Sequence, residues 1–122
     1  MKTIKMLFTV AILVATVLSG NAQSDKTQRT IGIKVQSIKV SGTCSMDKRR
    51  IETAAYSVVG VKCAVWDEYT QILTLTCSVF QKGTSDSVQM KIASVGNDTE
   101  KYRADDLVYQ KLPDCCHYIR KS

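Results

Sequence analysis

One junction decides how this chain folds: residues 42–52 read Gly-Thr-Cys-Ser-Met-Asp-Lys-Arg-Arg-Ile-Glu and join a predicted strand to a predicted amphipathic helix. At such a junction the thiol of Cys44 lies among the unpaired N–H groups and at the positive dipole end of the helix. That environment favours the thiolate, which is the form of cysteine that binds soft metal ions or attacks disulfides. The junction is therefore the first candidate for a functional site.

Two helices and four strands are predicted around this junction. The first helix covers residues 46–59, where apolar residues recur at helical spacing, and Gly60 ends it. A strand precedes it over 31–40, with a change of phase at residues 36–37 that indicates a bulge or two short pieces of strand. Strands over 61–67 and 72–79 follow, then a helix capped by Thr84 and ended by Gly96, and a short edge strand over 97–102.

This order of elements predicts the fold class. We expect an α+β sandwich of ferredoxin-like βαββαβ type, with an antiparallel sheet and both helices on one face. The alternation in the second and third strands places the following residues in the core: Ala64, Trp66, Leu73, Leu75, Cys77 and Val79. Cys63 is expected to face outward.

The two ends of the chain differ from this domain. Lys2 and Lys5 precede an apolar run over 6–18 and small residues at 19–22, the pattern of a secretory signal peptide over residues 1–22. The run is short for a membrane span, so we expect no membrane attachment after cleavage and export to the periplasm or beyond. A polar leader over 23–32 precedes the domain, 33–102. The extension over 103–122 is apolar enough to fold back onto the domain.

Composition and motifs argue against several functions. The net charge is +6, but the basic residues are scattered and their only run, 48–50, has no interleaved aromatic residues, so nucleic-acid binding is not indicated. The chain has one histidine, no nucleophile elbow and no glycine-rich phosphate loop. We therefore expect a protein that is not an enzyme.

The order of elements and the residues at the first turn resemble the heavy-metal-associated domain of copper chaperones and copper-transporting ATPases. The matching segments are Val40-Ser41-Gly42-Thr43-Cys44, Arg50-Ile51-Glu52-Thr53-Ala54, Gly60-Val61 and Val95-Gly96. The run Lys-Leu-Pro-Asp-Cys-Cys-His-Tyr over 111–118 resembles the tail of small exported bacterial members of this family. The resemblance implies binding or transport of a soft transition-metal ion, with copper first and zinc second. It also implies a metal-transporting or metal-accepting protein as partner.

The loop departs from the family pattern at one position. The resemblance implies two cysteines that hold Cu(I), but this chain has Cys44 and Asp47, and a carboxylate is a poor ligand for so soft an ion. Asp47 is either an oxygen ligand or an acidic residue that the helix dipole stabilises without any metal. Met46 offers a thioether, which we interpret as a packing residue.

The tail supplies the remaining candidate ligands, Cys115, Cys116 and His117. The 13 residues from Tyr102 to Cys115 span about 40 Å when extended, which is enough to return to the loop. The candidate metal site therefore comprises Cys44, Asp47, Cys115, Cys116 and His117.

Three hypotheses follow from the odd number of cysteines, five, in an exported chain. In the first, the tail cysteines rebuild a metal site with Cys44. In the second, disulfides replace that site and leave an interaction domain that has lost metal binding. In the third, Cys44 and a tail cysteine form a redox pair.

Overall fold

The structure is a computed structural model, and it describes residues 32–122. The predicted signal peptide, and all but the last residue of the predicted leader, lie outside the described residues. The elements are β1 (Ile33–Lys39), α3 (Ser45–Tyr56), β2 (Val61–Trp66), β3 (Ile72–Ser78), α4 (Thr84–Ser94), α5 (Asp106–Gln110) and the 3-10 turn η1 (Asp114–Cys116). Within residues 32–122, no helix combines the length and the apolar character that a bilayer span requires.

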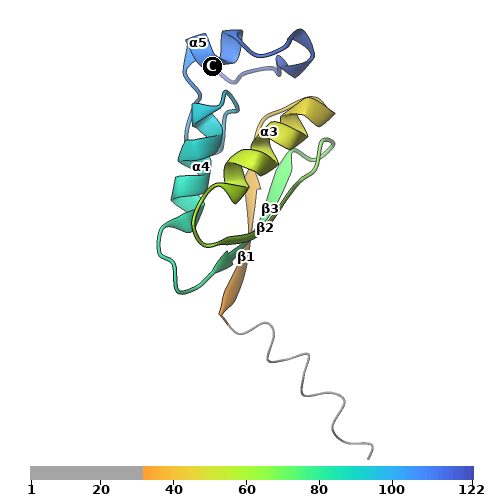
Figure 1. The fold of residues 1–122 in the computed structure, drawn as a ribbon. Helices are drawn as coiled ribbons and strands as arrows, with labels where there is room; N and C mark the ends of the chain where they lie inside the picture. The colour runs from red at the N-terminus through yellow and green to blue at the C-terminus, as the bar shows by residue number, and fades with distance from the viewer. Residues whose placement is uncertain (1–31) are drawn as a thin grey trace, which may run out of the picture. The chain divides into compact units, whose positions relative to one another are not determined.

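The three strands form one antiparallel sheet in the order β1-β3-β2, and α3 and α4 lie on the same face of it (Figure 1). The apolar positions of β2 and β3 meet those of the two helices in a single core. Its buried residues are Ile38, Val40, Ile51, Ala54, Ala55, Ala64, Trp66, Leu73, Leu75, Cys77, Val88 and Ile92. The predicted fold class is confirmed. Val79 is an exception to the predicted core, because it lies beyond the end of β3 and is exposed.

The predicted edge strand over 97–102 is reduced to one isolated bridge, between Val40 and Thr99. The chain turns at this point instead of extending: the Thr99 N–H donates to the Tyr102 carbonyl at 2.8 Å. The Asp98 carboxylate accepts a bond from the Ala104 N–H at 2.7 Å, which tightens the turn. Side-chain acceptors that bond nearby backbone N–H groups favour turns over strands. The outer edge of β1 is therefore left without a full strand partner.

The predicted bulge or break in the first strand is wrong. The register of β1 against β3 runs without interruption from Ile33 opposite Ser78 to Lys39 opposite Ile72. The irregularity lies in β2, between Val61 and Cys63.

Only the last part of the first strand contributes to the core. Ile38 and Val40 are buried, and because side chains alternate along a strand, Ile33 and Val35 point to the opposite sheet face. Val35 is consequently 62% exposed. The apolar residues that precede the change of phase in the sequence thus belong to the uncovered face of the sheet.

Candidate metal site

Cys44 is the N-cap residue of α3, in an extended conformation with φ −146° and ψ 172°. The loop reaches this position because Gly42 passes close to the core: a Cβ atom at Gly42 would lie 2.8 Å from the Trp66 ring. A larger residue would displace the loop. The Lys48 N–H donates to the Cys44 carbonyl at 3.1 Å and so closes the first turn of the helix. The prediction that Cys44 stands at a helix N-terminus is confirmed.

The C-terminal segment folds back onto the domain, as predicted, and lies beside the N-terminal end of α3 (Figure 1). Leu112, Cys116 and Tyr118 are buried together in a small second core, against which Cys44 and Tyr109 pack. The Thr43 hydroxyl donates to the Cys115 carbonyl at 2.6 Å. These contacts bring the two adjacent cysteines over the loop that carries Cys44.

A polar clasp fixes the end of this segment. The Tyr118 hydroxyl accepts a bond from the Asp98 N–H at 2.8 Å and donates to the Gly96 carbonyl at 2.7 Å. The Arg120 guanidinium forms two bonds with the Asp98 carboxylate, at 2.9 and 3.0 Å, and lies 4.6 Å from the centre of the Tyr109 ring. A bidentate arginine–carboxylate pair fixes orientation as well as distance. The clasp thereby determines where the preceding turn, η1, sits.

Three sulfur atoms meet as a result. The Sγ atom of Cys44 lies 3.3 Å from that of Cys116 and 3.8 Å from that of Cys115. The two tail sulfurs are 3.8 Å apart. All three residues, like Cys63 and Cys77, are free thiols in the structure. Among residues 32–122 this trio forms a group whose donor atoms lie within 4.8 Å of one another, close enough to share one metal ion.

The thiols of Cys44 and Cys116 have different acidities. Burial acts to raise the pKa of Cys44, but hydrogen bonds from the Asp47 N–H, the Cys116 thiol, the Met46 N–H and the Cys115 thiol together lower it below the usual value. For Cys116, burial dominates and raises the pKa to about 11. Of these two, Cys44 is therefore the thiol that ionises first, and a bound cation would favour the ionised form of Cys116.

Arg50 connects the thiol trio to the loop. Its Nη2 atom lies 3.6 Å from Cys116 Sγ, and its Nη1 atom donates to the Asp47 carboxylate at 2.7 Å. The guanidinium places a permanent positive charge beside sulfur atoms that must be anionic to bind metal. It thus lowers the electrostatic cost of gathering three thiolates.

Asp47 lies next to the trio but is engaged elsewhere. Its side chain is fully buried and accepts bonds from the Thr43 N–H at 2.8 Å, from Arg50 at 2.7 Å and from the Asn97 amide at 2.9 Å. One carboxylate oxygen is 3.7 Å from Cys44 Sγ. With these partners the carboxylate organises the loop around Cys44, and it is not one of the donors that the structure groups together.

His117 follows the two tail cysteines in sequence but is directed away from them. Its Nε2 atom is 3.2 Å from the Tyr109 carbonyl, and its ring packs against the Tyr109 ring with centroids 5.1 Å apart. The structure therefore brings together Cys44, Cys115 and Cys116 of the predicted ligands, leaves Asp47 adjacent and separates His117.

One sulfur atom beside the trio belongs to a residue that was not among the predicted ligands. Met46, interpreted from the sequence as a packing residue, is 47% exposed, and its Sδ atom lies 3.5 Å from Cys115 Sγ. Its position in the first turn of α3, two residues after Cys44, is the sequence feature that could have indicated it.

The trio has the dimensions of a metal site. Three thiolates bonded to one ion at about 2.3 Å lie about 3.8 Å apart in tetrahedral geometry and about 4.0 Å apart in a plane. Two of the sulfur–sulfur distances are 3.8 Å and the third is 3.3 Å, so an opening of a few tenths of an ångström accommodates the ion. The donor set consists of sulfur alone, which favours Cu(I) or Zn(II) over hard cations.

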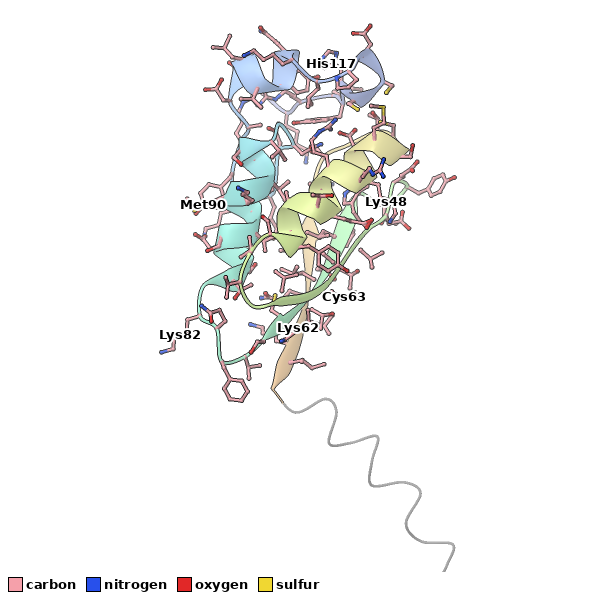
Figure 2. All side chains as sticks on the ribbon, viewed as in Figure 1. Lys48, Lys62, Cys63, Lys82, Met90 and His117 are labelled. Atoms are coloured by element: carbon pink, nitrogen blue, oxygen red, sulfur yellow. The ribbon has the colours of Figure 1, made fainter. Side chains whose placement is uncertain are left out.

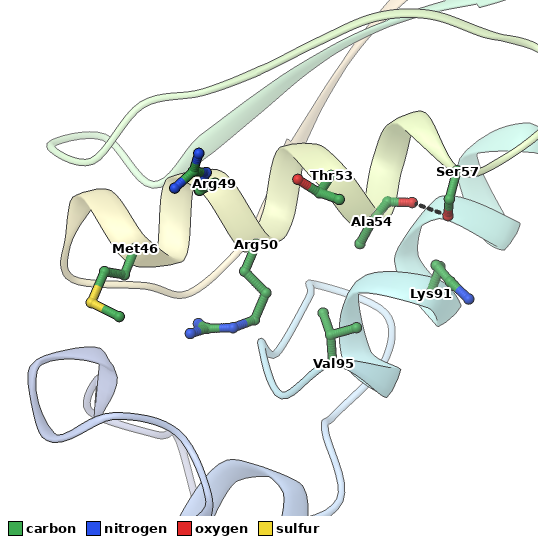
Figure 3. A pocket seen from close by; sticks show the side chains of 8 residues that line it. All are labelled: Met46, Arg49, Arg50, Thr53, Ala54, Ser57, Lys91 and Val95. Carbon is green, nitrogen blue, oxygen red and sulfur yellow. Dashed lines mark hydrogen bonds between the residues drawn. The ribbon is translucent and has the colours of Figure 1, made fainter.

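An open groove lies beside the site, between α3 and α4 (Figure 3). Its volume is about 500 Å³. Met46 stands at the end nearest the C-terminal segment, and Ser57, which donates to the Ala54 carbonyl at 2.6 Å, stands at the other. Arg49 and Lys91 give its rim a positive charge.

The fold is ferredoxin-like, so the resemblance stated from the sequence is confirmed at the level of the fold. Among solved structures, the CopZ metallochaperone matches with a TM-score of 0.50 and 19% identity, over 54% of this chain and 98% of CopZ. The water-soluble region of the P-type ATPase CopA from Bacillus subtilis gives a TM-score of 0.49 and 26% identity, over 55% of this chain and 44% of that chain. No protein-family model and no curated protein sequence matches the chain.

Proposed function

We propose that this protein binds and carries a soft metal ion, Cu(I) before all others, through the thiolates of Cys44, Cys115 and Cys116. The observation that supports the proposal is the meeting of three sulfur atoms at 3.3–3.8 Å from two segments that are remote in sequence. Thiolates are the ligands that Cu(I) prefers, and Zn(II) is the second choice for the same donors. The tail thus replaces the cysteine that the loop lacks.

We infer that the protein transports the bound ion and does not use it in catalysis. CopZ, which shares the fold, is named a metallochaperone. Cys115 is exposed and Cys44 is half-buried, so the site is accessible from solvent, which would permit the ion to be passed to another protein. We therefore propose a metal-transporting or metal-accepting protein as the partner, and no chemical step on the ion.

Export is a second part of the proposal. The basic and apolar pattern of residues 1–22 supports secretion across a membrane, where a carrier would meet copper outside the cytoplasm. Cleavage after this segment would release the carrier into the periplasm or the medium.

The decisive experiment is Cu(I) binding to the reduced protein, measured by competition with a chromophoric chelator. We expect one equivalent to bind, and C44S, C115S and C116S each to weaken binding by roughly 100-fold or more, since loss of even a supporting contact costs about 10- to 100-fold. C63S is the matched control, because Cys63 is an exposed thiol on β2, away from the segment that carries His117 (Figure 2). If C44S and the tail variants bind Cu(I) as the parent does, the proposal is refuted.

A further inference from the structure

Met46 occupies an unusual position for a methionine. It is the second residue of α3, it is 47% exposed, and it does not belong to either apolar core. Methionine side chains usually fill gaps in cores, where their flexibility and polarisability help packing. Because its side chain is this exposed, core packing does not explain why a methionine occupies this position.

The sulfur atom of Met46 instead lies against one thiol of the trio, that of Cys115. Its distance of 3.5 Å from Cys115 Sγ is comparable with the distances of 3.3 and 3.8 Å within the trio itself. Sulfur ligands that share one ion at about 2.3 Å in tetrahedral geometry lie about 3.8 Å apart. Figure 3 shows the thioether at the start of α3, directed toward the C-terminal segment.

We propose that Met46 Sδ is a fourth donor to the ion held by Cys44, Cys115 and Cys116, and that it makes the site selective for soft monovalent metal ions. This inference rests on the proposed function, because it needs the thiolate site to exist. A thioether is a neutral and soft ligand, so it strengthens binding of Cu(I) or Ag(I) and contributes little to the harder Zn(II). It also adds no negative charge to a site that already gathers three thiolates.

Met46 and Cys116 differ in how accessible they are to solvent. Met46 lines the groove between α3 and α4 together with Arg49 and Arg50, whereas Cys116 is buried. The thioether is therefore more accessible to solvent than the sulfur of Cys116. A weak neutral ligand at that point is the one that an incoming thiolate of a partner would displace first.

The inference is tested by comparing M46L with M90L in the reduced protein. Leucine keeps the size and apolar character of methionine, so packing is preserved while the sulfur is lost. Met90, on α4, is the matched control because it is 53% exposed and is the other methionine among residues 32–122. Each variant is titrated with Cu(I) by chelator competition and with Zn(II) by a chromophoric indicator.

We expect M46L to weaken Cu(I) binding about tenfold, the lower end of the change that loss of a supporting contact produces at metal sites, and to leave Zn(II) binding unchanged. M90L should match the parent for both ions. A direct reading comes from the methyl signals of ¹³C-methyl-methionine protein titrated with Ag(I). The Met46 signal, identified by its absence in M46L, should shift with the first equivalent, and the Met90 signal should not.

The outcomes separate the two proposals. If the parent binds Cu(I) tightly and M46L binds it equally well, Met46 is not a ligand and the three-thiolate site stands. Equal weakening of Cu(I) and Zn(II) binding in M46L would likewise overturn the inference, because it would indicate a general structural effect. If the parent binds neither Cu(I) nor Ag(I), the proposed function fails and this inference fails with it.

Discussion

Cys44 and Cys116 are 72 residues apart in the sequence, yet their Sγ atoms lie 3.3 Å apart. The first belongs to the loop before α3 and the second to a turn that is held by the C-terminal clasp. Their acidities are opposed, since the pKa of Cys44 is lowered and that of Cys116 is raised to about 11. This pair is consequently suited to two reactions, joint ligation of a cation and oxidation to a disulfide.

The first prediction concerns oxidation of this pair. Treatment of metal-free C63S protein with glutathione disulfide should join Cys44 to Cys116, because the more acidic Cys44 thiol supplies the attacking thiolate and Cys116 then displaces glutathione. Mass spectrometry of proteolytic fragments would identify the cross-link, and the oxidised protein should no longer compete for Cu(I). A cross-link to Cys115 in its place would contradict the prediction.

The second prediction concerns the clasp. Y118F removes a buried hydroxyl that bonds both the Asp98 N–H and the Gly96 carbonyl, and leaving such groups unpaired should cost about 1–3 kcal/mol. We also expect weaker Cu(I) binding, because the clasp positions the tail cysteines. Urea unfolding and chelator competition measure the two effects. The matched control is Y69F, since Tyr69 is 95% exposed, and it should behave as the parent does.

The third prediction concerns Asp47. In D47N, either orientation of the new amide places an NH₂ group against a donor, the Thr43 N–H on one side or Arg50 on the other. We expect a loss of about 2–4 kcal/mol in the free energy of unfolding of the metal-free protein. The half-buried helical pair of Lys48 and Glu52 provides the control: E52Q should cost about 0.5 kcal/mol or less.

The same variant decides the role of Asp47 toward metal. If its carboxylate organises the loop, D47N should impair Cu(I) binding less than C44S does at a temperature where both variants remain folded. A loss of Cu(I) binding in D47N as large as that in C44S would instead make Asp47 a direct ligand.

The fourth prediction concerns pH. Burial acts to raise the pKa of Asp98, but its bonds from Arg120 and from the Ala104 N–H lower it below the usual 3.8. A carboxylate whose pKa is lowered by folding stabilises the protein above the pKa of the unfolded chain, and this contribution is lost as the pH falls toward the lowered value. D98N should therefore be less stable than the parent at neutral pH.

This difference in stability should shrink as the pH falls below about 4, and unfolding by urea across that range would measure it. A difference between D98N and the parent that stays constant with pH would show that the charge of Asp98 contributes nothing.

Much of the domain follows from local sequence patterns. The alternation through β3 and the helical spacing around Ile51 determine which faces are buried, since both depend only on the geometry of each element. The loss of the fourth strand does not follow in this way, because it depends on bonds that the Asp98 turn makes with Ala104 and Arg120, which lie outside the predicted strand.

At the candidate site, too, some features could be predicted from the sequence and others depend on tertiary contacts. The tail cysteines could be predicted to return to Cys44 because chain length and the helix terminus are properties of the sequence. The orientations of their neighbours could not, because they are set by tertiary contacts. His117 turns toward Tyr109, and Met46 faces Cys115 from the exposed side of α3.

The clasp around Arg120 has a consequence for how an ion would leave. Two of the three proposed thiolates, Cys115 and Cys116, belong to a segment that is attached to the rest of the domain by a small core and a few polar bonds. Docking of that segment and capture of the ion are then linked equilibria, each favouring the other by the same free energy. A protein that competed for the surface under the segment would therefore lower the affinity for the ion, so an opening of this segment would promote cargo release alongside any exchange of ligands at Met46.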